Sequence, residues 1–302
     1  MKLSGLVLLT ILSASAFTAT ADEVIFAKND FIIYSTKDKK IVKPIEIINQ
    51  MDSINVLFFG EEHNDSIGHM MQNLILQLLY KKFDSRVVLS MEMFDRDVQY
   101  IMDEYLQGII KRSYFLKDSK VWSNYSDYEP MVEFAKQNGL SVICANAPFR
   151  YVNVASTQGI DGLMKLSPDA KKSLAPLPYN LAAGAYADKL NALMGHDPND
   201  PNSKPSYNMI PGQSLWDATM AYSIYERLQV KKDAKILHLV GRFHVEEGFG
   251  IVQRMAEFDA NIKSIILTLV GDAENYPNVK FEDYKNLGEY IIFTNPEVLK
   301  SY

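Results

Sequence analysis

Two short segments of the sequence each end an apolar run in the pattern Gly-x-x-His. The first is VLFFGEEHND at residues 56–65, which contains His63, and the second is LHLVGRFHVE at 237–246, which contains His244. Histidine can exchange protons near neutral pH, and neutral imidazole is a common metal ligand. Neighbouring carboxylates could orient the imidazole or share a metal ion with it. The repeated pattern therefore marks a candidate chemical site.

Glu92 is a further candidate because it stands inside the otherwise apolar run VVLSMEMF at residues 87–94. Burying a carboxylate without compensation is costly or shifts its pKa. We therefore expect Glu92 to be hydrogen-bonded or functional.

Two histidines with one or two carboxylates allow three uses, and the residues alone leave the choice open. A divalent metal ion with an open position for water could be held by Glu61, His63, Glu92 and His244. Without a metal, His63 or His244 could act as a general base on water, with Glu92 or Glu62 orienting it. The same residues could instead line a pocket whose ligand is held elsewhere. The sequence contains neither His-Glu-x-x-His nor Gly-x-Ser-x-Gly, so it has no compact zinc signature and no nucleophile elbow.

The elements that must position these residues begin with apolar runs of strand length. These runs are continuous rather than alternating, which is typical of strands buried on both faces of a parallel sheet. Helical patterns of apolar residues lie between several of them. The alternation predicts an α/β fold with a three-layer or doubly wound, mainly parallel sheet. The five runs are 55–60, 86–93, 140–146, 235–241 and 262–271.

Three other segments complete the expected architecture. Residues 150–212 interrupt the alternation and are predicted to form an insertion between the third and fourth strands, helical at first and then looped. The segment EYIIFT at 289–294 is expected to add an edge strand, and FIIYS at 31–35 a small flanking hairpin.

In open α/β sheets, ligands bind beyond the carboxyl ends of the strands, where the loops diverge. Four successive strands of the predicted sheet deliver ionisable or amide side chains to that edge. We interpret each glycine of the Gly-x-x-His pattern as permitting a sharp turn into the following helix, with the histidine facing the crevice. The side chains at this edge are Glu61, Glu62, His63, Glu92, Asn146, Arg242 and His244.

The beginning of the chain and its charge bear on where the protein works. Residues 1–21 have a lysine near the start, a short apolar stretch and Ala-Thr-Ala before Asp22, which is typical of a cleavable secretory signal. We expect residues 22–302 to form a single domain in the periplasm or outside the cell. No cysteine lies near the cleavage site, so we do not expect a lipoprotein anchor. A net charge of −6 without a basic cluster argues against nucleic-acid binding.

Other reactive side chains have ordinary structural interpretations. His69 falls on the polar face of the helix after GEEH and is expected to be solvated, as is His196 in the proline-rich loop. His238 lies inside KILHLVG and is expected to be a hydrogen-bonded core residue. The lone cysteine, Cys144, lies in an apolar run and is expected to be a buried, inert thiol.

An ordered set of short motifs runs through much of the sequence. The motifs are GEEH (60–63), MEMFDRDVQ (91–99), YLQG (105–108), Trp122, YSDYEPMVEFAK (125–136), ANAPFR (145–150), SLWDATMAYSI (214–224) and GRFHVEEGFGI (241–251). This set resembles the ChaN-like haem-binding uptake family, which shares a superfamily with erythromycin esterases, TraB proteins and Tiki proteases. The resemblance covers roughly residues 50–255 and implies an α/β fold of that type with haem as the cargo.

The resemblance implies roles for particular positions. It marks His63, His244, Glu92 and one of Glu61 or Glu62, which correspond to the active site in hydrolytic relatives. In the ChaN branch it implies haem bound through a tyrosine, with haems held between two subunits. The candidate iron ligands by region are Tyr179, Tyr186 and Tyr207. Arg150 or Arg242 could meet the haem propionates, because guanidinium pairs well with carboxylates.

The sequence also departs from the family pattern. Phe149 stands as an extra residue between Pro148 and Arg150, and Phe243 and Val252 replace a usual glycine and proline. These changes keep both histidines and alter the pocket wall. The leading hypothesis is an exported haem-binding dimer in iron uptake that cooperates with outer-membrane haem-uptake machinery. The alternative is a hydrolase that uses His63, His244 and Glu92, with or without a divalent metal.

Overall fold

The computed structural model describes residues 26–27, 29–196, 203–204, 206–298 and 300–301. The predicted signal segment, 1–21, lies outside the described residues. In the part of the chain that is described, no helix combines the length and the apolar character needed to cross a membrane.

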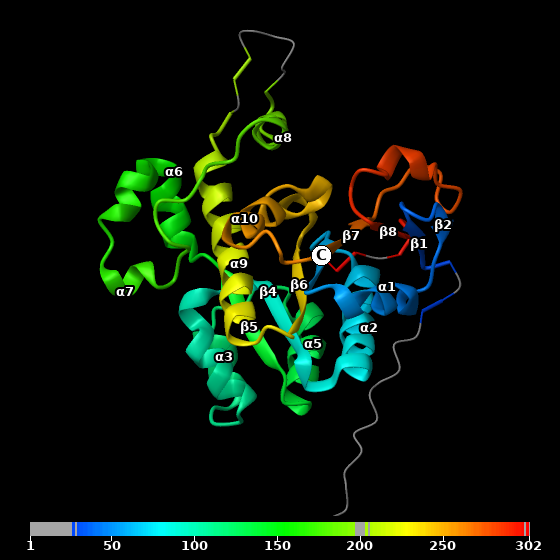
Figure 1. Ribbon diagram of the computed structural model, residues 1–302, viewed down its shortest axis with the longest axis horizontal. Coiled ribbons are helices and arrows are strands. Elements are labelled where there is room, and N and C mark those ends of the chain that lie inside the picture. Colours follow the sequence, from blue (N-terminus) through cyan, green and yellow to red (C-terminus); the bar gives the residue numbers. More distant parts are fainter. Residues whose placement is uncertain (1–25, 28, 197–202, 205, 299, 302) are drawn as a thin grey trace, which may run out of the picture.

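One sheet runs through the described part of the chain, in the strand order β2-β1-β8-β7-β3-β6-β4-β5 (Figure 1). The six strands from β8 to β5 are parallel to one another, whereas β1 is antiparallel to both β8 and β2. The fold is therefore a mainly parallel α/β sheet, as predicted. The strands are β1 (Phe31–Ser35), β2 (Lys40–Ile41), β3 (Val56–Glu61), β4 (Val87–Asp95), β5 (Ser141–Asn146), β6 (Lys235–Gly241), β7 (Ser264–Val270) and β8 (Tyr290–Thr294).

The five predicted parallel strands are confirmed as β3 to β7, and the predicted hairpin is confirmed as β1 with β2. The prediction that residues 289–294 form an edge strand is wrong. β8 lies inside the sheet because β1 pairs with its outer side, from Phe31 opposite Thr294 to Ser35 opposite Tyr290.

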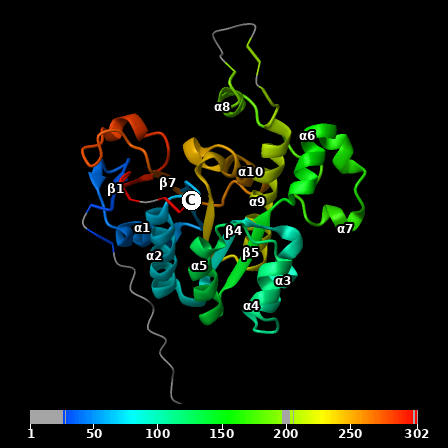
Figure 2. The same ribbon diagram turned by 180° about the vertical axis from the view of Figure 1, so that it is seen from behind.

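Helices cover both faces of the sheet, so that alternate residues of each strand enter different cores. Leu57 and Phe59 of β3 pack in one core with α2 and α5, and Val56 and Phe58 pack in the other with α9 and α10. Figure 2 shows α2, α5 and α3 side by side. The helices outside the insertion are α1 (Pro44–Gln50), α2 (Ser66–Phe83), α3 (Gln99–Leu106), α4 (Arg112–Asp118), α5 (Tyr125–Gln137) and α10 (Ile251–Phe258).

The predicted insertion between the third and fourth parallel strands is present. Figure 1 shows α6, α7 and α8 standing clear of the sheet, with α9 leading the chain back to it. Cis peptide bonds precede Pro178 in this insertion and Pro277 beyond β7. The insertion comprises α6 (Phe149–Met164), α7 (Pro168–Lys171), α8 (Ala185–Leu193) and α9 (Ile210–Val230).

The chain changes direction between the two central strands, β3 and β6. From β3 it passes through α2 on one face to reach β4, and from β6 it passes through α10 on the other face to reach β7. Because the two connections leave neighbouring strands toward opposite faces, the carboxyl ends of β3 and β6 form a switch point of the kind at which ligands of open α/β sheets bind, and we call this place the crevice. Both Gly-x-x-His segments lie at this crevice.

Candidate functional site

The two glycines of the Gly-x-x-His pattern allow the two segments to approach each other closely. In the parallel register Gly60 lies opposite Val240, and Glu61 lies opposite Gly241. A Cβ on Gly60 would lie 3.0 Å from the Arg242 Cα, and one on Gly241 would lie 3.0 Å from the His63 Nε2. Each glycine therefore makes room for the other segment.

This packing corrects our interpretation of the glycines as turn residues. Gly60 and Gly241 both belong to strands, and neither is among the glycines with positive φ. Gly241 has φ −55° and ψ 132°, which any residue can adopt. The lack of a side chain matters here, and not the backbone freedom of glycine.

The first histidine is held by a buried carboxylate at the end of β3. Glu61 is 2% exposed, and its Oε1 lies 2.6 Å from the His63 Nδ1. The Tyr128 hydroxyl on α5 donates to the same oxygen at 2.6 Å, and the Gln72 amide on α2 donates to Oε2. The Trp122 ring meets the His63 ring edge to face at 5.2 Å. Glu61 thus orients His63 and is itself fixed by two helices.

The second histidine has a matching arrangement built from the insertion. The Asp217 Oδ1 on α9 lies 2.5 Å from the His244 Nδ1, and Asp217 is 1% exposed. The Tyr186 hydroxyl on α8 donates to the Asp217 Oδ2 at 2.8 Å. The Gln213 amide nitrogen lies 3.2 Å from that hydroxyl oxygen and 3.0 Å from the His244 Nδ1.

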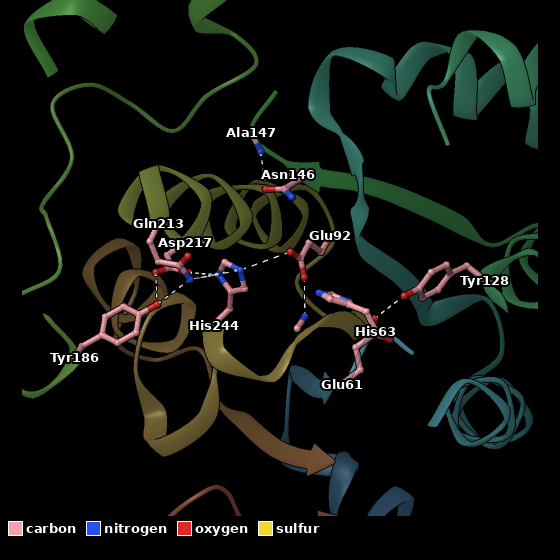
Figure 3. A network of polar contacts seen from close by, with 11 residues as sticks. Glu61, His63, Glu92, Tyr128, Asn146, Ala147, Tyr186, Gln213, Asp217 and His244 are labelled. Atoms are coloured by element: carbon pink, nitrogen blue, oxygen red, sulfur yellow. Dashed lines mark hydrogen bonds and ion pairs between the residues drawn. The ribbon is translucent and has the colours of Figure 1, made fainter. Parts of the chain in front are cut away.

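Glu92 lies between the two histidines, as Figure 3 shows. Its Oε2 accepts a hydrogen bond from the Gly241 N–H at 2.6 Å, and its Oε1 lies 3.5 Å from the His244 Nε2. A Cβ atom added to Gly241 would lie 3.0 Å from the His63 Nε2 and 3.6 Å from the Glu92 Oε2, so both groups border the space above this glycine. The expectation that Glu92 is hydrogen-bonded is therefore met.

The carboxylates shift the protonation of both histidines. Burial lowers the pKa of His63, but the Glu61 hydrogen bond and the Glu92 charge outweigh it and raise that pKa. Burial likewise opposes the imidazolium of His244, and the Glu92 and Asp217 carboxylates outweigh it and raise its pKa. Burial raises the pKa of Glu61, yet its contacts with His63 and Tyr128 bring it below the ordinary value. A protonated His63 beside an ionised Glu61 is therefore favoured, whereas burial raises the pKa of Asp217 despite its contact with His244.

The two histidines differ in their access to a ligand. The side chain of His63 is 38% exposed, whereas that of His244 is 9% exposed. Carboxylates lie near both ring nitrogens of His244, whereas the Nε2 of His63 faces the crevice over Gly241. A water or a substrate hydroxyl in the crevice would therefore meet His63 and Glu92.

Several residues predicted for this site lie apart from the chain of contacts in Figure 3. Glu62 turns toward β7, where it accepts from the Gly271 N–H at 3.1 Å and pairs with Arg242 at 3.8 Å. Arg242 also pairs with Glu246. Asn146 accepts a hydrogen bond from the Ala147 N–H at 2.9 Å.

The predicted metal ligands are not brought together as a metal centre. Within the described residue ranges, no group of three or more histidine, cysteine, aspartate or glutamate side chains could hold a metal ion. Glu61, His63, Glu92 and His244 instead satisfy one another in pairs.

A separate apolar pocket of about 340 Å³ lies between α6 and the start of α9. Tyr207, one of the three candidate iron ligands, lines this pocket and is 53% exposed. Tyr179 and Tyr186 are buried, with their hydroxyls donating to the Pro211 carbonyl and to Asp217. Arg150, which follows the pocket residue Phe149, pairs with Asp97 at 2.6 Å.

The remaining histidine and cysteine predictions have mixed outcomes. The prediction that His69 is solvated is wrong: it is 5% exposed, because α5 covers the polar face of α2 there and Tyr128 packs against its ring at 4.9 Å. His238 is a core residue, as predicted, with its Nδ1 2.8 Å from the Ser90 hydroxyl. Burial lowers the pKa of His238 to about 3, so it is neutral. Cys144 is buried, as predicted.

Sequence reasoning missed Tyr128, Gln72, Asp217 and Gln213 as parts of the site. A signal for two of them was present. Gln213 and Asp217 are four residues apart in a helix whose next residues on that face, Ala221 and Ile224, are buried and apolar. Polar side chains on the buried face of a helix need partners, just as Glu92 does in its strand.

Comparison with known proteins gives one family and several structural neighbours. Residues 47–255 match the family described as "Haem-binding uptake, Tiki superfamily, ChaN". The structure reported as "Cofacial heme binding to ChaN of Campylobacter jejuni" has a TM-score of 0.63 and 18% identity, and the match covers 88% of this chain and 97% of that one. A mutant of the erythromycin esterase EreC has a TM-score of 0.46 and 12% identity, with 87% and 83% of the two chains covered.

One curated relative is much longer than the matched region. Protein RETICULATA-RELATED 5, chloroplastic, from Arabidopsis thaliana is 23% identical over 175 residues, which are 55% of this chain and 23% of that protein. The match therefore spans about a quarter of the length of this relative.

The close approach of the two segments predicts that Gly60→Ala and Gly241→Ala act differently. Gly60→Ala forces a methyl group against the backbone of Arg242 and should cost about 1–3 kcal/mol of unfolding free energy. Gly241→Ala meets the partly exposed His63 ring, which can move, so its stability cost should be smaller while the His63 NMR signals shift. Denaturant unfolding and NMR of both variants check this, and equal stability losses would contradict it.

The raised pKa of His244 predicts a pH-dependent contribution to stability. The pKa of His244 is higher in the folded state than in the unfolded state, where it is about 6.5. Protonation of such a histidine stabilises the folded protein fully at pH values below the unfolded-state pKa. This stabilisation is lost as the pH rises through the folded-state pKa. The difference in unfolding free energy between wild type and His244→Gln should therefore be larger at about pH 6 than at about pH 9. His196→Gln in the loop is the control, and a His244 difference that stays constant or grows with pH would refute the expectation.

Proposed function

Because the chain belongs to the ChaN family of haem-binding uptake proteins in the Tiki superfamily, we propose that it is an exported protein that binds haem in the pocket between α6 and α9. The observation that supports this location is an apolar pocket with a partly exposed tyrosine at its wall. The signal-like segment at residues 1–21 supports export to the periplasm or beyond.

The chemistry of the pocket suits a flat apolar macrocycle. Aromatic and thioether side chains provide half of its lining residues, and such groups pack well against an extended ring system. Gln213 and Asn153 add polar groups that could fix its orientation. The apolar lining residues are Phe149, Val152, Met194, Tyr207, Met209 and Trp216.

Tyr207 is the iron ligand in this proposal. Its phenol is at the pocket, and a tyrosine oxygen is an established axial ligand for haem iron. Tyr179 and Tyr186 would have to break hydrogen bonds and leave buried positions before they could bind iron. Arg150 is half-exposed beside Phe149, and we propose that it pairs with a haem propionate. To do so, its guanidinium would leave its present ion pair with Asp97.

A second copy of the chain is the proposed cover of the pocket. Phe149 is 68% exposed and Tyr207 is 53% exposed, so a haem held between them would keep one face in water. Pairing two such faces in a symmetric dimer would bury both macrocycles.

A hemin titration of the mature chain from Asp22 tests the haem proposal. We expect saturable binding with a Soret band, and Tyr207→Phe should change that band and weaken binding by about tenfold or more, or about 1.4 kcal/mol. Tyr179→Phe and Tyr186→Phe should retain the band. Tyr114→Phe is the matched control because Tyr114 is 57% exposed on α4 and does not line the pocket.

The outcomes separate the parts of this proposal. Weak, unsaturable association in wild type would reject haem binding in the pocket. Saturable binding that survives Tyr207→Phe would reject Tyr207 as the ligand.

The crevice supports a second candidate function, a metal-independent hydrolase. The specific observation is that Glu92 lies between two histidines, each of which is oriented by its own carboxylate (Figure 3). Such a group can take a proton from water and return it to a leaving group. His63 would serve as the accessible base.

Hydrolysis of 4-nitrophenyl acetate and of a fluorogenic peptide tests this second function. Glu92→Gln and His63→Asn should each lower kcat by about 10²–10⁴-fold, the usual contribution of general acid–base catalysis. Tyr207→Phe should leave hydrolysis unchanged, since its side chain lines the separate pocket. Background rates in wild type would reject a hydrolase for these substrate classes.

A further inference from the structure

We propose that Tyr128 and Tyr186 are paired positioning residues, one for each histidine of the crevice. Each tyrosine fixes a buried carboxylate, which in turn directs the Nδ1 proton of its histidine away from Glu92 and presents Nε2 toward it. The predicted catalytic consequence rests on the second candidate function, whereas the positioning itself does not.

The first set of contacts joins α5 to β3. An ionised carboxylate only accepts hydrogen bonds, so the 2.6 Å contact with Glu61 Oε1 requires a proton on the His63 Nδ1. The Tyr128 hydroxyl donates to the same oxygen at 2.6 Å and fixes its position. In neutral His63 the Nε2 is then an acceptor, and it faces the crevice over Gly241.

The second set joins α8 to α9 and has the same order of groups. Tyr186 is 2% exposed, and its hydroxyl donates to the Asp217 Oδ2 at 2.8 Å. The other oxygen, Oδ1, contacts the His244 Nδ1 at 2.5 Å, and the Gln213 amide nitrogen, 3.0 Å from that Nδ1, donates to the Tyr186 hydroxyl instead. The His244 Nε2 lies 3.5 Å from Glu92. Figure 3 shows these groups and the first set on opposite sides of Glu92.

The two sets come from unrelated parts of the chain, which is why their similarity is informative. Tyr128 precedes the third parallel strand, and Tyr186 belongs to the insertion after it. Without Tyr186 the Asp217 Oδ2 would lose its hydrogen-bond donor, and without Tyr128 the Glu61 Oε1 would keep only its contact with His63, so either carboxylate would have more freedom to rotate. The histidine would then no longer be confined to one tautomer, because the partner of one ring nitrogen sets the state of the other.

The experiment is NMR of protein labelled with ¹⁵N at histidine, recorded at a pH where both imidazoles are neutral. In wild type we expect His63 and His244 each to show a single tautomer with the proton on Nδ1. Tyr128→Phe should cause loss of the single tautomer at His63 alone, and Tyr186→Phe should do so at His244 alone. A pH profile of hydrolysis, where activity is found, should change in both variants.

Two tyrosines supply matched controls. Tyr125 is buried on the same helix as Tyr128, and in the described part of the chain its hydroxyl has no hydrogen-bond partner. Tyr179 donates to a backbone carbonyl and does not touch either carboxylate. Tyr125→Phe and Tyr179→Phe should therefore leave both tautomers unchanged.

The wild-type spectrum keeps the inference testable even where a variant fails to fold. A proton on Nε2 of either neutral histidine in wild type would overturn it. Unchanged tautomers in folded Tyr128→Phe and Tyr186→Phe would overturn it as well, as would equal effects of the control variants.

Hemin binding distinguishes this inference from the proposed functions. Retention of the Soret band in Tyr186→Phe together with a mixed His244 tautomer supports a positioning role for Tyr186. Loss of the band in Tyr186→Phe with the His244 tautomer unchanged would make Tyr186 an iron ligand and overturn its positioning role. The tautomer result stands independently of whether the crevice hydrolyses any substrate.

Discussion

The parallel pairing of β3 with β6 is the constraint on which the site depends. These strands lie at the centre of the sheet, where their connections leave toward opposite faces. Gly60 and Gly241 let the two strand ends approach each other, so the segments beyond them share one crevice. A side chain at Gly60 would press on the backbone of Arg242, and one at Gly241 would displace the His63 ring, so either would change the relation between His63 and His244.

Compensation of buried charge explains the remainder of the crevice. Three carboxylates, Glu61, Glu92 and Asp217, are almost excluded from solvent, and burial of that kind is costly unless each is hydrogen-bonded or paired. Donors on α5, on α8, at the end of β6 and in the segments that follow β3 and β6 satisfy them through histidine, tyrosine and backbone N–H groups. The same contacts that allow the carboxylates to be buried also orient the histidines for chemistry.

The apolar pocket between α6 and α9 and the crevice are neighbours that share the start of α9. Gln213 lines the pocket and also lies 3.0 Å from the His244 Nδ1. Trp216 lines the pocket, and its ring meets the His244 ring at 6.3 Å. The chain thus places the polar arrangement of the two histidines directly beside the apolar pocket.

The sequence by itself determined the parallel sheet, the insertion and the gathering of Glu61, Glu92 and the two histidines at one edge. Continuous apolar runs and local motifs carry that information, because they depend on the burial and spacing of neighbouring residues. Only the tertiary structure decided that Glu61, and not Glu62, holds His63, since Glu61 ends β3 under the cover of α2 and α5, whereas Glu62 follows the strand and turns toward Gly271. It also decided the partners Tyr128, Tyr186 and Asp217, the burial of His69 under α5 and the interior place of β8. These contacts join residues far apart in the chain, and no local pattern specifies which helix will cover which face.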